Sequence, residues 1–278
     1  MPVLHAIVLA IVQGVTEFLP VSSDGHLVLV PWLLRWEDQG LAFDGAIHLG
    51  TLAAVIIFFR REWLGLARGL FTGAPVRFGS PHGEQGEMAV WKLAGLLAAA
   101  TVPTGIIGFA LKGDVEGPLR KPEWAAAFLI GTALALLAGE VIGRRVRRME
   151  KADLKDAVLM GIAQGLAVFP GLSRSGSTIA TGLARGLTRE AAGRLSFLIA
   201  VPAITGAAAL LLLDMVRAED VAHPGWGVIA IGIAGAFLTG LAALGLLMRL
   251  LRRGSLRPFI VYCAAVGIAV LIARALGA

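Results

Sequence analysis

Long uncharged runs constrain this chain more than any other feature of its sequence. A bilayer-spanning helix needs about 17 to 25 predominantly apolar residues, and six stretches meet that requirement. Apolar residues make up 57% and charged residues 16% of the 278 residues, which is more apolar surface than a water-soluble core of this length buries. We therefore expect an all-α polytopic membrane protein with transmembrane helices at 43–59, 90–111, 123–142, 192–214, 225–247 and 257–276.

Two further apolar segments contain helices too short to cross. Residues 4–36 are interrupted by Pro20-Val21-Ser22-Ser23, and residues 154–187 by Pro170-Gly171-Leu172-Ser173. Proline and glycine break helices, and irregular backbone at membrane depth is stable only where protein or water covers it. Each segment is therefore predicted to be a re-entrant helical hairpin with its polar turn inside the membrane.

The two interrupted segments are copies of one another. Each copy is followed by three expected spans, and this odd number makes the second copy enter from the opposite side, as in many inverted repeats. We predict a first repeat at 1–142 and a second, inverted repeat at 143–278, with the hairpin tips meeting near the midplane. A shift of 151 positions places Gln13-Gly14 on Gln164-Gly165, Phe18 on Phe169, Val21-Ser22 on Leu172-Ser173 and Gly25 on Gly176.

Basic residues collect in the loops on one side of this arrangement. Arg60, Arg61, the segment 144–155, Arg189 and the segment 249–257 all fall there. Because Lys and Arg are retained on the cytoplasmic side, this side is predicted to be cytoplasmic and both termini are predicted to lie outside. Membrane orientation thus accounts for the net charge of +6, and nucleic-acid binding is not expected. The first apolar run lacks a basic leader and is expected to belong to the mature fold.

The first hairpin carries residues with catalytic potential. Glu17 lies in an apolar segment with Gln13 four residues earlier on the same helical face, where a carboxylate is costly unless it faces protein, water or a cation. Glu17 is therefore a candidate metal ligand or acid–base group, and the alternative is a glutamate near a membrane boundary. Ser23 and His26 follow the break and offer a hydroxyl beside a proton acceptor. The alternatives are that Ser22 to Asp24 only cap a helix and that His26 only packs, as we expect for His5 and His48.

The second hairpin carries a pattern suited to an anion. The segment Ser173-Arg174-Ser175-Gly176-Ser177-Thr178 combines a guanidinium, four hydroxyls and the free N–H groups of a helix start, which together bind phosphate. A buried ion pair between Arg174 and Glu17 is the alternative, and both interpretations bring the hairpins into contact. Two helix N-termini converging from opposite sides favour a multiply charged anion, which a divalent cation, magnesium or calcium, would help to neutralise.

These motifs together resemble the undecaprenyl-diphosphate phosphatase family of bacteria, the membrane phosphatases associated with bacitracin resistance. The family pattern E/Q-x-x-x-E-F-L-P-V-S-S-x-G-H is matched from Gln13 to His26, and P-G-x-S-R-S-G-x-T from Pro170 to Thr178. The resemblance covers nearly the whole chain. It implies metal-dependent hydrolysis of undecaprenyl diphosphate to the monophosphate and inorganic phosphate, which recycles the lipid carrier for cell-wall synthesis, on the outer face of the cytoplasmic membrane.

The resemblance also implies roles for individual residues. Gln13 replaces a glutamate that is frequent in the family, which removes a formal charge. Asp24 stands where the family usually has Ser or Thr; it either supplies the missing charge or caps the helix, and we favour the cap. The catalytic groups implied are Glu17, Ser23, His26 and Arg174, with Glu17 as the metal ligand. The substrate-binding residues implied are Gln13, Ser22, Gly25, Ser173, Ser175, Gly176 and Thr178.

Two other functions fit parts of the sequence. Inverted repeats with broken helices are also common in secondary transporters, so a polyprenyl-phosphate flippase is the main alternative, although a pure carrier has no use for the Ser23–His26 pair. The segment 23–26 also resembles the P-S-G-H motif of another lipid-phosphatase superfamily, whose remaining motifs the sequence lacks. The expected partners are the polyprenyl diphosphate lipid and the membrane. The oligomeric state, a homodimer included, the metal and the covalent or direct route of hydrolysis stay open.

Overall fold

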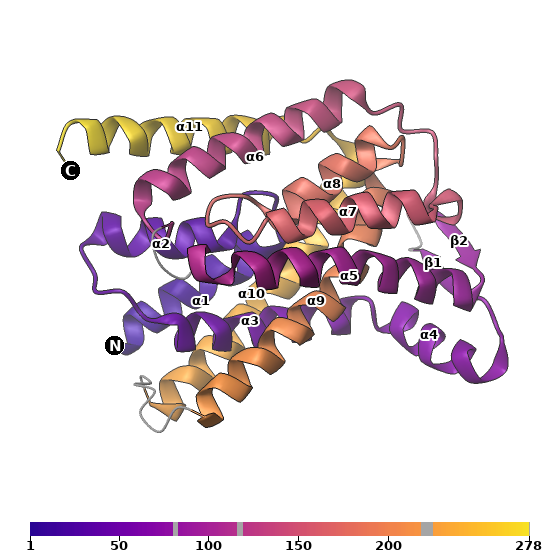
Figure 1. Ribbon diagram of the computed structural model, residues 1–278, viewed down its shortest axis with the longest axis horizontal. Coiled ribbons are helices and arrows are strands. Elements are labelled where there is room, and N and C mark those ends of the chain that lie inside the picture. Colours follow the sequence, from indigo (N-terminus) through magenta and orange to yellow (C-terminus); the bar gives the residue numbers. More distant parts are fainter. Residues whose placement is uncertain (80–82, 116–118, 218–224, 278) are drawn as a thin grey trace.

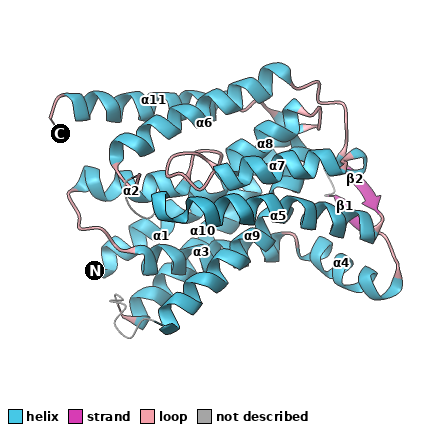
Figure 2. Ribbon diagram, in the orientation of Figure 1, coloured by secondary structure: helices cyan, strands magenta, loops and turns pink. Residues whose placement is uncertain are grey.

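The computed structural model describes residues 1–79, 83–115, 119–217 and 225–277 of the chain. Its elements are almost all helices (Figure 2). In the described part, five helices are long and apolar enough to cross a membrane, and a bent pair of helices is a sixth candidate. The predicted polytopic α-helical membrane protein is confirmed at this level.

In chain order the elements are α1 (Val3–Phe18), α2 (Ser23–Leu34), α3 (Leu41–Phe58), α4 (Arg60–Thr72), β1 (Val76–Gly79), β2 (Gln85–Met88), α5 (Val90–Val115), α6 (Pro122–Ile142), a 3-10 turn (Met149–Lys151), α7 (Leu154–Leu166), α8 (Arg174–Ala184), α9 (Arg189–Arg217), α10 (Trp226–Arg253) and α11 (Arg257–Ala275).

One expected span differs from the others. The stretch predicted at 43–59 is α3, which bends by 72° after Phe58 and continues as α4. Helix α4 is not expected from the sequence, because Arg60, Arg61 and Arg68 exclude it from any uncharged run. The glycine- and proline-containing segment that follows forms an antiparallel hairpin of β1 and β2, apart from residues 80–82, which lie outside the described residues. The other expected spans correspond to α5, α6, α9, α10 and α11.

The predicted hairpins are the pairs α1–α2 and α7–α8. Figure 1 shows α1 and α2 extending toward the end that holds both termini, and α7 and α8 extending toward the opposite end, beside β1 and β2. Their tips are in contact, because the Gly171 N–H donates a hydrogen bond to Ser22 Oγ at 3.0 Å. The backbones are so close that a Cβ on Gly25 would lie 2.8 Å from Gly171 Cα. The predicted contact between the two tips is confirmed.

Glycines allow the hairpin helices to pack closely against the spans. A Cβ on Gly14 of α1 would lie 2.0 Å from Thr239 Oγ1 of α10. A Cβ on Gly161 of α7 would lie 2.3 Å from the Ala100 carbonyl oxygen of α5, and Gly165, one turn later, faces the same helix. Small residues at such positions let helix backbones approach in lipid, where packing drives association. The glycine spacing in 161–165 therefore has a packing role.

Candidate active site

Glu17 is the centre of the site. Its side chain is only 5% exposed, at the C-terminal end of α1. Oε2 accepts hydrogen bonds from Gln13 Nε2 at 3.0 Å and from Ser23 Oγ at 2.5 Å, and Oε1 forms an ion pair with Arg174. A carboxylate is stable in a buried place when its oxygens are paired in this way. Both helices of the first hairpin and the start of α8 in the second hairpin therefore converge on one carboxylate.

Arg174 joins the second hairpin to the first. It is the first residue of α8, and its Nη2 pairs with Glu17. The Nη1 atom is buried and has no hydrogen-bond partner among the described residues. A buried donor without a partner is costly, and guanidinium groups bind carboxylate and phosphate with two parallel nitrogens. The ion pair and the anion-binding role are therefore compatible, because each uses a different nitrogen.

Ser22 shapes the first tip. It precedes α2 with a φ of +68°, a left-handed conformation that costs energy for a residue other than glycine. In this conformation its Oγ accepts from Gly25 N at 3.3 Å and from Gly171 N at 3.0 Å, so that it caps α2 and holds the second tip. The expected cap by Asp24 is wrong, because α2 already begins at Ser23 and Asp24 lies within its first turn, with its side chain 47% exposed.

His26 is not paired with Ser23 in the described structure. Its Nδ1 lies 2.7 Å from the Ser22 carbonyl oxygen, and its Nε2 lies 2.8 Å from the Tyr262 hydroxyl on α11. A carbonyl oxygen only accepts, so Nδ1 carries the proton and Nε2 of a neutral ring accepts from the tyrosine. The expected contact between the hydroxyl of Ser23 and His26 is wrong for this conformation, since the hydroxyl is directed to Glu17 instead.

His48 belongs to the site and is more than a packing residue. From α3, its Nε2 lies 3.6 Å from Glu17 Oε2 and 3.6 Å from Asp24 Oδ1. Its Nδ1 donates to the Asp44 carbonyl oxygen at 2.7 Å, which fixes the ring between the two carboxylates. The packing role expected for His48 is therefore wrong, whereas His5 does pack, stacked on a tryptophan ring. An Asp and a His one turn apart in an otherwise apolar span are the signal for such a role.

The hydroxyls of the second motif are engaged with the protein. Ser173 caps α8, because its Oγ accepts from Gly176 N at 3.0 Å. Ser175 Oγ donates to a main-chain carbonyl of the first tip, and Thr178 Oγ1 lies 2.6 Å from Ser196 Oγ on α9. These residues, expected at the substrate, hold the start of α8 in place. They thereby fix the position of the arginine that begins this helix.

Comparison with known proteins assigns the chain to a family. The family model described as "Bacitracin resistance protein BacA" matches residues 6–269, which include both hairpin tips. The chain belongs to the BacA family. It is 40% identical over 275 residues to undecaprenyl-diphosphatase 2 of Stutzerimonas stutzeri, covering 98% of each chain. It is also 40% identical over 270 residues to undecaprenyl-diphosphatase of Geobacter metallireducens, covering 97% of each chain. The family indicated by the two motifs is confirmed.

The oxygen atoms of this BacA-family site fit a hard cation only in part. Within the described residues, no group of three or more His, Cys, Asp or Glu side chains has an arrangement that could hold a metal ion. However, Gln13 Oε1 is buried without a partner there, next to the Glu17 carboxylate. A buried acceptor without a donor has capacity for a cation, and magnesium and calcium prefer oxygen ligands. Glu17 and Gln13 are therefore the residues that could hold such an ion.

Tyr262 and Thr132 are site residues outside both motifs. Tyr262 is the only tyrosine in the sequence and contacts His26, while the Thr132 hydroxyl on α6 accepts from Ser173 N at 2.8 Å and donates to the Gly171 carbonyl oxygen at 2.9 Å. Each lies inside a predicted span, away from the charged residues near its ends. An isolated polar side chain at membrane depth needs a partner, and this is the signal that could have marked both.

Proposed function

We propose that this BacA-family member hydrolyses undecaprenyl diphosphate to undecaprenyl phosphate and inorganic phosphate, recycling the lipid carrier for cell-wall synthesis and conferring bacitracin resistance. The contact between Glu17 and Arg174 carries the proposal. It places a guanidinium with an unused buried nitrogen beside a hydroxyl held by a carboxylate. These are the groups that phosphoryl transfer needs, namely a clamp for charge and a positioned nucleophile. The names of its relatives agree with this activity.

The diphosphate would bind where the two tips meet. Arg174 Nη1 would donate to a phosphate oxygen, and the N-termini of α2 and α8 would add their positive dipole ends. Ser22 and Ser173 fix both helix starts, since each caps its own helix. Binding by groups fixed before the substrate arrives favours the transition state, because no reorganisation is needed as charge develops.

Ser23 is the proposed nucleophile. Its oxygen would attack the terminal phosphorus while the bridging P–O bond breaks, releasing the polyprenyl monophosphate, and water would then hydrolyse the phosphoserine to give inorganic phosphate. Glu17 is the group hydrogen-bonded to this hydroxyl and thus the acceptor for its proton. His26 Nε2, held by Tyr262, is the proposed acid–base group for water, in the second step or in direct attack.

A divalent cation, magnesium or calcium, would supply charge neutralisation of the diphosphate when bound. Glu17 and Gln13 would hold it through their oxygens. Arg174 pairs with the same carboxylate, so cation binding would weaken the ion pair and the ion pair would weaken cation binding. Asp24 adds negative charge on the exposed side of His48 and would raise the local cation concentration.

The two halves, 1–142 and 143–278, are proposed to be inverted repeats. Equivalent hairpin helices pack against equivalent spans of the other half, since α1 contacts α10 and α7 contacts α5. Gly14 and Gly165, which the sequence shift places together, lie in these two contacts. Because each hairpin packs against a span of the other half, neither half would bury its polar tip alone.

We further propose that the site opens to the outside of the cytoplasmic membrane of a bacterium. Basic loops such as 144–155 lie at the end opposite the termini, and such loops favour the cytoplasm. The half-exposed Asp24 lies beyond Glu17, next to His48 of α3. Labelling of single cysteines tests this: Glu37→Cys should react in intact cells, and Arg148→Cys only after permeabilisation. The reverse pattern would contradict it.

Phosphate release by purified protein tests the activity. In detergent, where two compartments do not exist, the protein given a C55 diphosphate and magnesium should release inorganic phosphate. Absence of release, together with transfer of polyprenyl phosphate between leaflets of vesicles, would favour the flippase instead. Trapping of a phosphorylated Ser23 would support the covalent route, and near-normal turnover of Ser23→Ala would exclude it. The mass of the solubilised particle tests the homodimer.

A further inference from the structure

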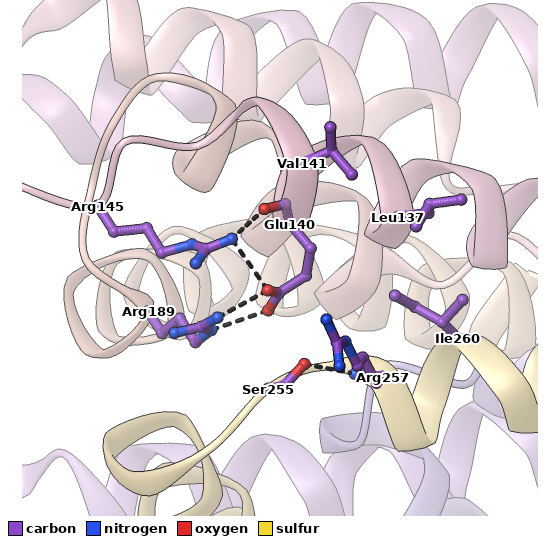
Figure 3. A pocket seen from close by; sticks show the side chains of 8 residues that line it. All are labelled: Leu137, Glu140, Val141, Arg145, Arg189, Ser255, Arg257 and Ile260. Atoms are coloured by element: carbon purple, nitrogen blue, oxygen red, sulfur yellow. Dashed lines mark hydrogen bonds and ion pairs between the residues drawn. The ribbon is translucent and has the colours of Figure 1, made fainter.

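A cavity lies between the ends of three helices, outside the site around Glu17. It has a volume of about 380 Å³ and is bounded by the C-terminal turn of α6, the start of α9 and the start of α11 (Figure 3). The basic segment 144–155 leads out of α6 at this end. The residues that line the cavity are Leu137, Glu140, Val141, Arg145, Arg189, Ser255, Arg257 and Ile260.

The carboxylate of Glu140 is already paired and cannot neutralise more of the positive charge in this cavity. Its carboxylate accepts from Arg189 Nε at 2.8 Å and Nη2 at 2.7 Å, a bidentate pair. It also accepts from Arg145 Nη2 at 3.0 Å and from the Leu256 N–H at 3.0 Å. Four donors therefore occupy the two oxygens. The lining contains three arginines against this one carboxylate, so positive charge is in excess.

Two of the arginines keep unused donors. The Arg145 Nε–H is buried and has no partner among the described residues. Arg257 is exposed, and its guanidinium makes no hydrogen bond or ion pair with any described residue; Figure 3 shows it beside Glu140. A cavity with excess positive charge and unpaired guanidinium donors attracts a multidentate anion such as a phosphate group.

One wall of the cavity is apolar and continues onto the outer surface. Leu137, Val141 and Ile260 form this wall, and Val141 is 75% exposed. Ile142 and Val146 extend the apolar surface beyond it. The cavity lies where α6 ends and α11 begins, the depth at which lipid headgroups meet the ends of spanning helices. A phosphate group and an acyl chain would thus be accommodated side by side.

We propose that this cavity binds the phosphate of an anionic phospholipid. The phosphodiester oxygens accept from Arg257 and from the free donor of Arg145, while an acyl chain lies along Leu137 and Val141. Basic pockets between helix ends are suited to such headgroups. The bound lipid links the α6–α7 connection to the α10–α11 connection. This site is independent of the proposed phosphatase activity.

Lipid binding by the purified full-length chain tests the proposal. In mixed micelles, native mass spectrometry should detect phosphatidylglycerol retained in preference to phosphatidylcholine. Removal of one surface cation weakens binding of an anionic headgroup about fivefold, so Arg257→Gln should raise the apparent Kd by that factor. Arg257→Lys should recover part of the affinity. Arg253→Gln, which removes an exposed arginine outside the lining, is the matched control and should bind as the unaltered chain does.

Two outcomes would overturn the proposal. One is equal phosphatidylglycerol affinity in Arg257→Gln and the unaltered chain. The other is displacement of the lipid by inorganic phosphate at the same concentration as the lipid, which would assign the cavity to a free anion. Because Arg257 has no side-chain partner among the described residues, the variant should keep its unfolding temperature and its phosphate release. A change in binding is thereby separated from a change in folding.

Discussion

Ser23 Oγ lies 2.5 Å from Glu17 Oε2, so the two arms of the first hairpin are joined by a hydrogen bond between their candidate catalytic groups. The same carboxylate pairs with Arg174 of the second hairpin through its other oxygen. Glu17 thus positions the nucleophile and the anion clamp together. Changes at this residue should therefore affect both binding and chemistry, unlike changes at any one of its partners.

Glu17→Gln should reduce kcat/KM for phosphate release by about 100-fold or more, a loss typical when a group that stabilises developing charge is removed. It also leaves Arg174 without its anionic partner in a buried place, so the unfolding temperature should fall. Phosphate-release kinetics and thermal unfolding in detergent measure the two effects. Glu37→Gln removes an exposed carboxylate of the α2–α3 connection and should leave both unchanged. Near-normal turnover of Glu17→Gln would exclude its proposed role.

Tyr262→Phe should lower kcat/KM by about tenfold or less, whereas His26→Ala should lower it by about 100-fold or more. The tyrosine hydroxyl only holds His26 Nε2, at 2.8 Å, while the ring itself is the proposed acid–base group. The pH profile of kcat distinguishes the roles, because removing the hydroxyl should shift the profile and removing the ring should abolish the dependence on one group. Equal losses in the two variants would instead assign both residues to packing.

Removal of divalent cations with a chelator should abolish phosphate release, and magnesium should restore it. Gln13→Glu adds a second carboxylate beside Glu17, so the magnesium concentration for half-maximal activity should fall by about tenfold, equivalent to roughly 1.4 kcal/mol. Gln13→Leu should have the opposite effect, because the unpaired Oε1 is lost. Titrations of activity with magnesium measure both. Identical magnesium dependence in all three proteins would place the cation elsewhere.

Most of the site could be located from the two motifs, because its polar residues are concentrated at two breaks in apolar sequence. Glu17 meets Arg174 and Ser22 meets Gly171, as expected if the two hairpin tips are in contact. The membrane class and most spans followed from hydropathy alone, since lipid requires every backbone group to be paired within helices. These predictions depend on local sequence.

The remaining site residues come from distant elements and could not be assigned in this way. His48 and Tyr262 lie in spans outside both motifs, and only three-dimensional packing brings them to Glu17 and His26. The cap of α2 depended on the positive φ of Ser22, which a side-chain pattern does not encode. Helix α4 could not be recognised because its arginines lower the hydropathy of the segment that follows the 72° bend after α3.

Protonation of Asp153 should weaken the start of α7. Burial opposes ionisation of this carboxyl, but the Asp156 N–H, Arg147 and Arg185 outweigh it and hold its pKa below the ordinary value of 3.8. A depressed pKa in the folded state contributes stability that is complete above the unfolded pKa and is lost as the pH falls through the folded pKa. Unfolding temperatures should therefore decline below about pH 4. Asp153→Asn retains a good helix cap and should show a shallower decline; parallel curves would contradict this.

Gly171→Ala should destabilise the protein more than any other single methyl addition at the tips. Gly171 has a φ of +101°, and a Cβ there would lie 2.1 Å from the Ala125 carbonyl oxygen on α6. The backbone strain alone costs about 1 to 3 kcal/mol, and the clash with a main-chain atom adds to it. Moving the tip would also displace the Gly171 N–H, which donates a hydrogen bond to Ser22 Oγ. Phosphate release should therefore fall together with the unfolding temperature.

Gly105→Ala in α5 is the matched control for this change. A Cβ at that position meets nothing within 4 Å, and alanine favours a helix over glycine by about 1 kcal/mol. This variant should therefore unfold at the same temperature or slightly higher and retain full activity. If Gly171→Ala behaved like this control, the close contact between the second tip and α6 would not exist in the membrane. The position of Arg174, three residues further along the same tip, would then lose its structural basis.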